Sequence, residues 1–422
     1  MTRYLFVLLL LAACATRATG QTTVIRAGRL VDPEAGAAAR NQTIVVEAGK
    51  VKAVGANVEV PKGASVIDLS RSTVMPGLFD AHTHLCMTIN LKRDAGNYYY
   101  TSIRDPDTYR AIQGVANARD MLASGFTTVR DVGNEGDYAC VSLRRAIAGG
   151  LVPGPTMLTA GRIIAPYGGQ FHLQPGRREL GEPEYFFADT RDEMRKAVRE
   201  NVHYGARVIK IVVDDQQYIY SVEDIKFIVA EARAVGLKVA AHAWTTAGIH
   251  NAVAAGVASI EHVNGITDED IAVAKQGGIT LVFTPFPEWA LRELGSSPEE
   301  AAKEYRDTGA RLAAAYKLGA TIAFGTDAAM AIPKYTRGTL SLAWIDSYVA
   351  AGMPPRAILQ AMTVNAARLF GVERERGQLK PGMAADIIAT PADPLEDIQT
   401  LKQINFVMKD GVVIKHDAGA RP

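Results

Sequence analysis

Between about residues 76 and 370, short apolar runs of strand length alternate with longer segments of helical character, many of which end in glycine. This alternation is typical of βα units whose strands form one parallel sheet. The region is long enough to hold eight such units. The pattern therefore predicts an α/β fold with a (β/α)8 barrel of the TIM type over residues 76–370.

Both ends of the chain have a different pattern, in which short β-rich runs are separated by turns. Residues 43–46 and 51–54 flank one turn, and residues 404–408 and 412–414 flank another. Two such runs on either side of a short turn predict a β-hairpin. We therefore expect one small β-sandwich domain that is built from both chain ends, residues 22–75 and 371–416.

The first residues have the pattern of an export signal. Arg3 precedes an unbroken apolar run over residues 4–13, which is too short to span a bilayer but suits the centre of a secretory signal. The sequence allows lipoprotein cleavage before Cys14 or ordinary cleavage before Gln21. We expect residues 1–20 to be a signal peptide and the protein to be exported, either periplasmic or anchored in a bacterial envelope through lipid on Cys14.

The composition is that of an ordinary globular protein. The 422 residues are 48% hydrophobic and 22% charged, with a net charge of +1 and no run of lysine or arginine. A nucleic-acid partner and a charged membrane-binding surface are therefore not expected. Beyond the signal only Cys86 and Cys140 remain, too few for a disulfide framework, and we expect both to be free, small, buried hydrophobic residues.

Candidate chemistry begins at Asp80-Ala81-His82-Thr83-His84, which ends an apolar run. Alternate residues of a strand point the same way, so His82 and His84 are a candidate metal-binding pair, although a lone histidine is more often a core residue. Lys210 lies within the aliphatic run of residues 207–213. An unpaired ammonium group is very costly there, and a buried ion pair is the structural alternative.

Three more candidates stand where predicted strands end. His242 and His262 each close an apolar run, and Asp327 follows the run of residues 320–326. Because the C-terminal ends of barrel strands meet on one face, we expect these three residues to share a cleft with the histidine pair and Lys210. His172 follows a glycine-containing loop and is a further candidate for the wall of that cleft.

These motifs, in this order, resemble the amidohydrolase superfamily. The similarity is greater to its imidazolonepropionase-like and Xaa-Pro dipeptidase (prolidase)-type branch, which includes ochratoxin-hydrolysing amidohydrolases, and it covers nearly the whole mature chain. Two positions depart from that pattern. Trp244 stands where relatives often have a second histidine, and Gly168-Gly169-Gln170 replaces a more usual Gly-Gly-His.

The resemblance implies two divalent metal ions, with zinc the best fit to the ligand types. His82, His84 and Asp327 would hold the first ion, and His242 and His262 the second. Lys210, as N-carboxylysine, would bridge both, because a buried lysine has a lowered pKa and its neutral amine can capture carbon dioxide. Asp327 would be the catalytic residue, moving a proton from the attacking water to the leaving nitrogen.

The expected activity is that of a binuclear amidohydrolase, which cleaves a peptide-like amide with metal-activated hydroxide. The substrate would be a small dipeptide or N-acyl amino acid, including ochratoxin-like N-acyl phenylalanine, that releases its C-terminal amino acid. A cyclic-amide or imidazolone hydrolase and a non-enzymatic metal-binding extracytoplasmic protein are the alternatives. Relatives imply a homo-oligomer. Possible substrate contacts are made by His172, Tyr218, Tyr220 and Trp244, although loop packing explains the aromatic residues equally well.

Overall fold

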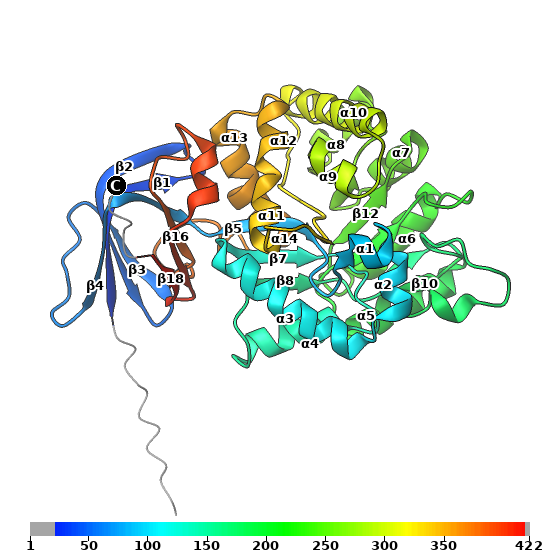
Figure 1. Ribbon diagram of the computed structural model, residues 1–422, viewed down its shortest axis with the longest axis horizontal. Coiled ribbons are helices and arrows are strands. Elements are labelled where there is room, and N and C mark those ends of the chain that lie inside the picture. Colours follow the sequence, from blue (N-terminus) through cyan, green and yellow to red (C-terminus); the bar gives the residue numbers. More distant parts are fainter. Residues whose placement is uncertain (1–21, 418–422) are drawn as a thin grey trace, which may run out of the picture.

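The computed structural model describes residues 22–417 and is shown in Figure 1. A sheet formed by the two chain ends lies on the left of that view, and parallel strands surrounded by helices lie on the right. The predicted signal peptide and Cys14 lie outside the described residues. Within residues 22–417, no helix is both long enough and apolar enough to cross a membrane.

The two ends of the chain share one seven-stranded sheet, in the order β18-β17-β16-β4-β1-β2-β3. The long strand β4 (Ser65–Pro76) joins them, because it pairs parallel with β1 (Thr23–Asp32) and antiparallel with β16 (Ile387–Thr390). The hydrogen bonds of β4 therefore make the sheet of the two chain ends continuous. The other strands are β2 (Ala37–Glu47), β3 (Lys50–Gly55), β17 (Phe406–Lys409) and β18 (Val412–His416).

The middle of the chain forms two parallel sheets, in the orders β5-β7-β8 and β10-β9-β11-β12-β13-β14. Helices follow most of these strands, as the alternation in the sequence predicts. The strands are β5 (Leu78–Thr83), β7 (Phe126–Asp131), β8 (Thr156–Thr159), β9 (Ile163–Ala165), β10 (Tyr185–Phe187), β11 (Ile209–Val212), β12 (Val239–Ala243), β13 (Ser259–His262) and β14 (Thr280–Val282). A separate parallel pair is formed by β6 (Ile89–Asn90) and β15 (Met330–Ala331).

Backbone hydrogen bonds also connect these two sheets. The N–H of Arg207, just before β11, donates to the carbonyl of Thr159 in β8 at 2.8 Å. Residues 321–324 lie between β14 and β5: Leu281 donates to Thr321 at 2.9 Å, and Ala81 donates to Phe324 at 2.8 Å. The segment that leads to Asp327 is thereby held beside the strand that carries the histidine pair.

The helices have clear start and stop signals. Capping boxes begin α5, α6 and α10, and glycines in the left-handed conformation follow α5 and α7, where a residue without Cβ is least strained. The α-helices are α1 (Leu91–Asp94), α2 (Tyr99–Arg104), α3 (Asp107–Ala123), α4 (Ala139–Ala148), α5 (Arg191–Tyr204), α6 (Val222–Arg233), α7 (Thr246–Ala255), α8 (Asp268–Gln276), α9 (Glu288–Glu293), α10 (Pro298–Lys317), α11 (Arg337–Ala343), α12 (Ile345–Ala350), α13 (Pro355–Gln360) and α14 (Ala366–Phe370).

The two cysteines of the described region are paired, which corrects the prediction of free thiols. Cys86 follows β5 and Cys140 lies in α4, and the disulfide joins them with their Cα atoms 5.7 Å apart. Both residues are buried, as predicted. The pairing is a contact between residues 54 positions apart, so no local sequence pattern indicates it.

Candidate metal centre

All six predicted metal-site residues line one cleft of about 520 Å³. Five of them lie at or just beyond the C-terminal end of a parallel strand or strand-like segment, and Lys210 lies within its strand. The C-terminal ends of parallel strands meet on one face, which explains why these side chains share a cleft. The residues are His82 in β5, His84 just after β5, Lys210 in β11, His242 in β12, His262 in β13 and Asp327 after residues 321–324.

His82, His84 and Asp327 form a first group. Oδ1 of Asp327 lies 3.2 Å from Nε2 of His84 and 3.9 Å from Nε2 of His82. Nδ1 of His82 lies 2.8 Å from Oε2 of Glu261, and Nδ1 of His84 lies 2.7 Å from the carbonyl oxygen of Gly133. A carboxylate and a carbonyl can only accept, so each Nδ1 donates and each Nε2 keeps its lone pair for a metal ion.

His242 and His262 form a second group, with ring centroids 4.6 Å apart. Nδ1 of His262 lies 2.9 Å from the hydroxyl oxygen of Thr284, which fixes the ring. Nε2 of His242 is buried and has no hydrogen-bond partner. Leaving such a polar atom unpaired costs about 1–3 kcal/mol, so this nitrogen fits a site that is completed by an ion.

Lys210 lines the same cleft as the two groups and is almost fully buried. Burial, opposed mainly by the charge of Glu261, lowers the pKa of the lysine to about 8. Among the described residues, no carboxylate lies within ion-pair distance of its Nζ, so the structural alternative of a buried ion pair finds no support. A partly neutral amine is the form that can react with carbon dioxide.

His82 is held from behind by two buried charged residues, Glu261 and Arg130. Nη2 of Arg130 donates to both carboxylate oxygens of Glu261 at 2.8 and 2.9 Å, while Nε of Arg130 donates to the carbonyl of Ala81 at 2.7 Å. Glu261 in turn accepts a hydrogen bond from His82. Arg130 therefore orients Glu261, and Glu261 orients the imidazole of His82 towards the metal site.

Replacing Glu261 by glutamine should weaken metal binding at the first group by about 10- to 100-fold, since the amide no longer orients and polarises His82 as a carboxylate does. Chelator-competition titration of the purified variant measures the affinity. Glu200→Gln, in α5 and outside the cleft, is the matched control and should bind metal like the wild-type protein. Wild-type affinity in Glu261→Gln would refute this role.

The loop that carries Asp327 is held by Asp80, another buried carboxylate. Asp80 accepts hydrogen bonds from the hydroxyl of Thr326 at 2.7 Å, from its N–H at 3.2 Å and from the N–H of His82 at 3.1 Å. Asp327 itself has φ of 54° and His262 has φ of 70°, a left-handed conformation that costs energy in residues other than glycine. The contacts of Asp80 hold Asp327 in position, and the contact with Thr284 holds His262.

The four predicted substrate contacts divide into two pairs. Trp244 and His172 line the cleft, and the indole of Trp244 stacks on His262 with ring centroids 5.3 Å apart. Tyr218 and Tyr220 do not line it. The exposed Tyr218 points its hydroxyl towards Asp224 at 3.4 Å, and the buried Tyr220 donates its hydroxyl to the carbonyl of Ala188 at 2.6 Å. Both tyrosines therefore take part in local packing and not in the wall of the cleft.

Several cleft residues have no counterpart in the sequence-based prediction. Asp215 is one example, and it had a signal, because it follows the apolar run that contains Lys210. Arg130, which supports Glu261 behind the cleft, is a second residue that the prediction missed. Tyr98, Asn134 and Gln170 also line the cleft. Gln170 belongs to the Gly168-Gly169-Gln170 motif that the resemblance singles out, whereas nothing in the local sequence of Tyr98 or Asn134 indicates a place in the cleft.

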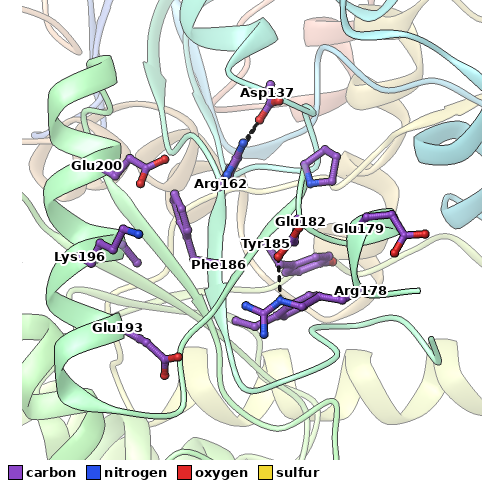
Figure 2. Close-up of a pocket in the computed structure, with 13 residues that line it drawn as sticks. Asp137, Arg162, Arg178, Glu179, Glu182, Tyr185, Phe186, Glu193, Lys196 and Glu200 are labelled. Atoms are coloured by element: carbon purple, nitrogen blue, oxygen red, sulfur yellow. Dashed lines mark hydrogen bonds and ion pairs between the residues drawn. The ribbon is translucent and has the colours of Figure 1, made fainter. Parts of the chain in front are cut away.

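A second pocket of about 550 Å³ lies apart from the predicted metal ligands, between α5 and the segment around β10. Figure 2 shows its charged lining, in which Arg162 pairs with Asp137 and Arg178 pairs with Glu182. The guanidinium of Arg162 also lies over the ring of Phe186. Its arginines are thus engaged by acids and rings, and the pocket contains none of the histidines.

Known proteins resemble this chain along most of its length. Ochratoxinase of Aspergillus niger is 32% identical over 438 residues, which cover 94% of this chain and 87% of that protein. Imidazolonepropionase of Symbiobacterium thermophilum is 27% identical, over 90% of this chain and 88% of that enzyme. The crystal structure of a Xaa-Pro dipeptidase with bound methionine in the active site matches with a TM-score of 0.81 and 29% identity, over 94% of this chain and 100% of the other.

Such relatives imply a TIM barrel with a small additional domain, which agrees with the α/β architecture and parallel sheets found here. They also confirm the resemblance that the histidine, lysine and aspartate motifs indicate. Residues 73–414 match the amidohydrolase family itself. The chain therefore belongs to the amidohydrolase family, and it is a hydrolase that acts on C–N bonds.

Proposed function

We propose that this protein is a binuclear metal-dependent amidohydrolase that releases a C-terminal amino acid from a dipeptide or an N-acyl amino acid. His82, His84 and Asp327 would hold one divalent ion, and His242 and His262 the other, both zinc. Lys210, as N-carboxylysine, would bridge them. The observation that carries the proposal is the convergence of these six side chains in one cleft, with the lone-pair nitrogens of the histidines free for ions.

When bound, the ions would supply Lewis acidity to a substrate carbonyl and lower the pKa of water, so that it can attack near neutral pH. Asp327 is positioned to accept the proton of that water. An aspartate carboxylate is ordinarily ionised near neutral pH, so Asp327 would be able to act as a base. It would then pass the proton to the leaving nitrogen, because an amine leaves poorly unless it is protonated.

The substrate class rests on the cleft and on the names of the relatives. Trp244, Phe286 and Met330 give the cleft an apolar wall beside the ligands, which suits the side chain of an amino acid. The relatives include ochratoxinase and a Xaa-Pro dipeptidase, so ochratoxin-like N-acyl phenylalanine and dipeptides are the first substrates to examine. The imidazolonepropionase relative favours a cyclic-amide hydrolase as the second candidate.

A screen of dipeptides, N-acyl amino acids and cyclic amides, scored by release of a free amino acid or by ring opening, tests this proposal. We expect amino-acid release, its loss after chelation, and its return when about two equivalents of zinc per chain are added. A non-enzymatic metal-binding protein would give no turnover in any state. Ring opening without amino-acid release would favour the cyclic-amide alternative, and full activity with one ion would refute the two-ion site.

We also propose that β5, β7, β8, β11, β12, β13, β14 and residues 321–324 close into a (β/α)8 barrel. Hydrogen bonds from Arg207 to Thr159, from Leu281 to Thr321 and from Ala81 to Phe324 support this closure. The catalytic domain would span residues 76–370, and residues 22–75 and 371–416 would form the composite β-domain. A crystal structure with continuous hydrogen bonding around the ring tests the closure.

Export of the protein remains a proposal, with residues 1–20 as the signal peptide and Cys14 as a possible lipid anchor. The Cys86–Cys140 disulfide supports it, since such bonds persist in oxidising compartments. Mass spectrometry of protein from its own host should detect a chain that lacks the first residues, and an intact Met1 would refute export. Light scattering of the same material tests the expected homo-oligomer.

A further inference from the structure

The carboxylate of Asp215, which is outside the predicted ligand set, faces the second group of histidines. It lines the cleft three residues after β11, and its Oδ2 lies 3.0 Å from Nε2 of His242. We propose that Asp215 is an additional ligand of the second metal ion, beside His242 and His262. The inference rests on the two-ion site of the proposed function and extends it to a residue from a different loop.

The contact between Asp215 and His242 has an unusual form. The two atoms are close, yet the buried Nε2 of His242 has no partner with the alignment of a hydrogen bond. A short distance without that alignment is expected of two ligands of one ion, because each directs a lone pair at the ion and not at the other ligand. His242 and Asp215 fit together as ligands of this kind, an imidazole and a carboxylate.

Asp215 is also held in the way that metal-binding carboxylates are held. Nε2 of Gln170 donates to Oδ2 of Asp215 at 2.6 Å. The hydroxyl of Tyr185 donates to Oε1 of Gln170 at 2.9 Å, and Nδ2 of Asn134 donates to that hydroxyl at 3.2 Å. This chain of hydrogen bonds fixes the amide that fixes the carboxylate, and it leaves lone pairs of Asp215 for an ion.

The neighbouring Asp214 does not have this freedom, although it lies in the same cluster. Its oxygens accept hydrogen bonds from the N–H of Trp244 at 3.0 Å and from the N–H and hydroxyl of Thr245 at 2.6 and 2.7 Å. Asp214 therefore caps the start of α7, and Asp215 is the carboxylate of the two that is available to a metal ion.

The test compares metal binding of the full mature chain with that of Asp215→Asn. Metal-free proteins are titrated with Co²⁺, whose visible absorption reports the ligand geometry, and Zn²⁺ affinities are measured by chelator competition. We expect Asp215→Asn to keep the first ion and to bind the second at least about tenfold more weakly, with an altered Co²⁺ spectrum for the second equivalent. Asp137→Asn, in the separate pocket of Figure 2, is the matched control and should behave like the wild-type protein.

Unchanged affinity for both ions and an unchanged Co²⁺ spectrum in Asp215→Asn would overturn the inference, while the two-ion function would stand. A wild-type chain that binds one ion would instead refute the two-ion function itself. If Asp215→Asn does not fold, Gln170→Met serves as the second variant, since it keeps Asp215 but removes its amide donor. Gln170→Met should bind the second ion more weakly than the wild-type protein, by a smaller factor than Asp215→Asn. Wild-type affinity in Gln170→Met would count against the assignment.

Discussion

Lys210→Ala should bind its metal ions more than about 100-fold more weakly, and its turnover should fall by a similar factor. Loss of a residue that supports a ligand costs about 10- to 100-fold in metal affinity, and loss of a bridging ligand should cost more. The variant lacks the anionic bridge that would separate two cations in the cleft. Metal content by mass spectrometry and amino-acid release from the best substrate of the screen measure the two losses. Lys238→Ala is the matched control, because Lys238 is exposed, lies just before β12 at the end away from the cleft, and donates to the backbone carbonyls of Arg368 and Leu369.

Two further observations separate a carboxylated lysine from an ordinary one. A short carboxylic acid added to Lys210→Ala should restore part of the metal binding and turnover, because it supplies the missing carboxylate in the vacated space. Lys210→Arg should remain inactive, since a guanidinium stays protonated and forms no carbamate. Near wild-type turnover with two bound ions in either variant would make Lys210 a structural residue.

Asp327→Asn should lower kcat by about 10²- to 10⁴-fold while two ions remain bound. The asparagine side chain keeps an oxygen that can bind a metal ion, but it cannot accept the proton of the attacking water.

Steady-state kinetics and metal analysis of the same preparation measure kcat and metal content separately, and Asp137→Asn is again the matched control. An unchanged kcat would exclude Asp327 as the base, and a parallel loss of metal would leave it a ligand only. If neither form turns over any substrate, the protein is a metal-binding protein without this activity.

Much of the candidate site follows from local sequence patterns, because two simple rules relate those patterns to positions in space. Alternate residues of a strand share a face, so His82 and His84 had to point together. Parallel strands end on one face, so residues at the ends of apolar runs, such as His242, His262 and Asp327, had to meet there. The alternation of strand and helix and the β-rich character of the two chain ends follow from periodicity and turn signals in the same way, whereas their joining into one sheet through β4 was seen only in the structure.

The substrate contacts could not be predicted so well, because they depend on loops. Tyr218 and Tyr220 follow the lysine strand closely, yet one hydroxyl faces Asp224 and the other is buried against a backbone carbonyl. Tyr98 and Asn134 line the cleft without any local signal. Loop residues have no periodicity that relates their position in the sequence to a direction in space, and short-range packing decides where they point.

The sequence by itself determined the family, the alternation of strands and helices, and the set of imidazole, lysine and carboxylate side chains at the ends of strands. Only the tertiary structure decided which side chains meet from distant segments: Arg130 with Glu261, Cys86 with Cys140, and Asp215 with His242. The physical reason is that the first set depends on the repeat of a strand or helix along the chain. The second set depends on how separate elements pack, and that packing is a property of the whole fold.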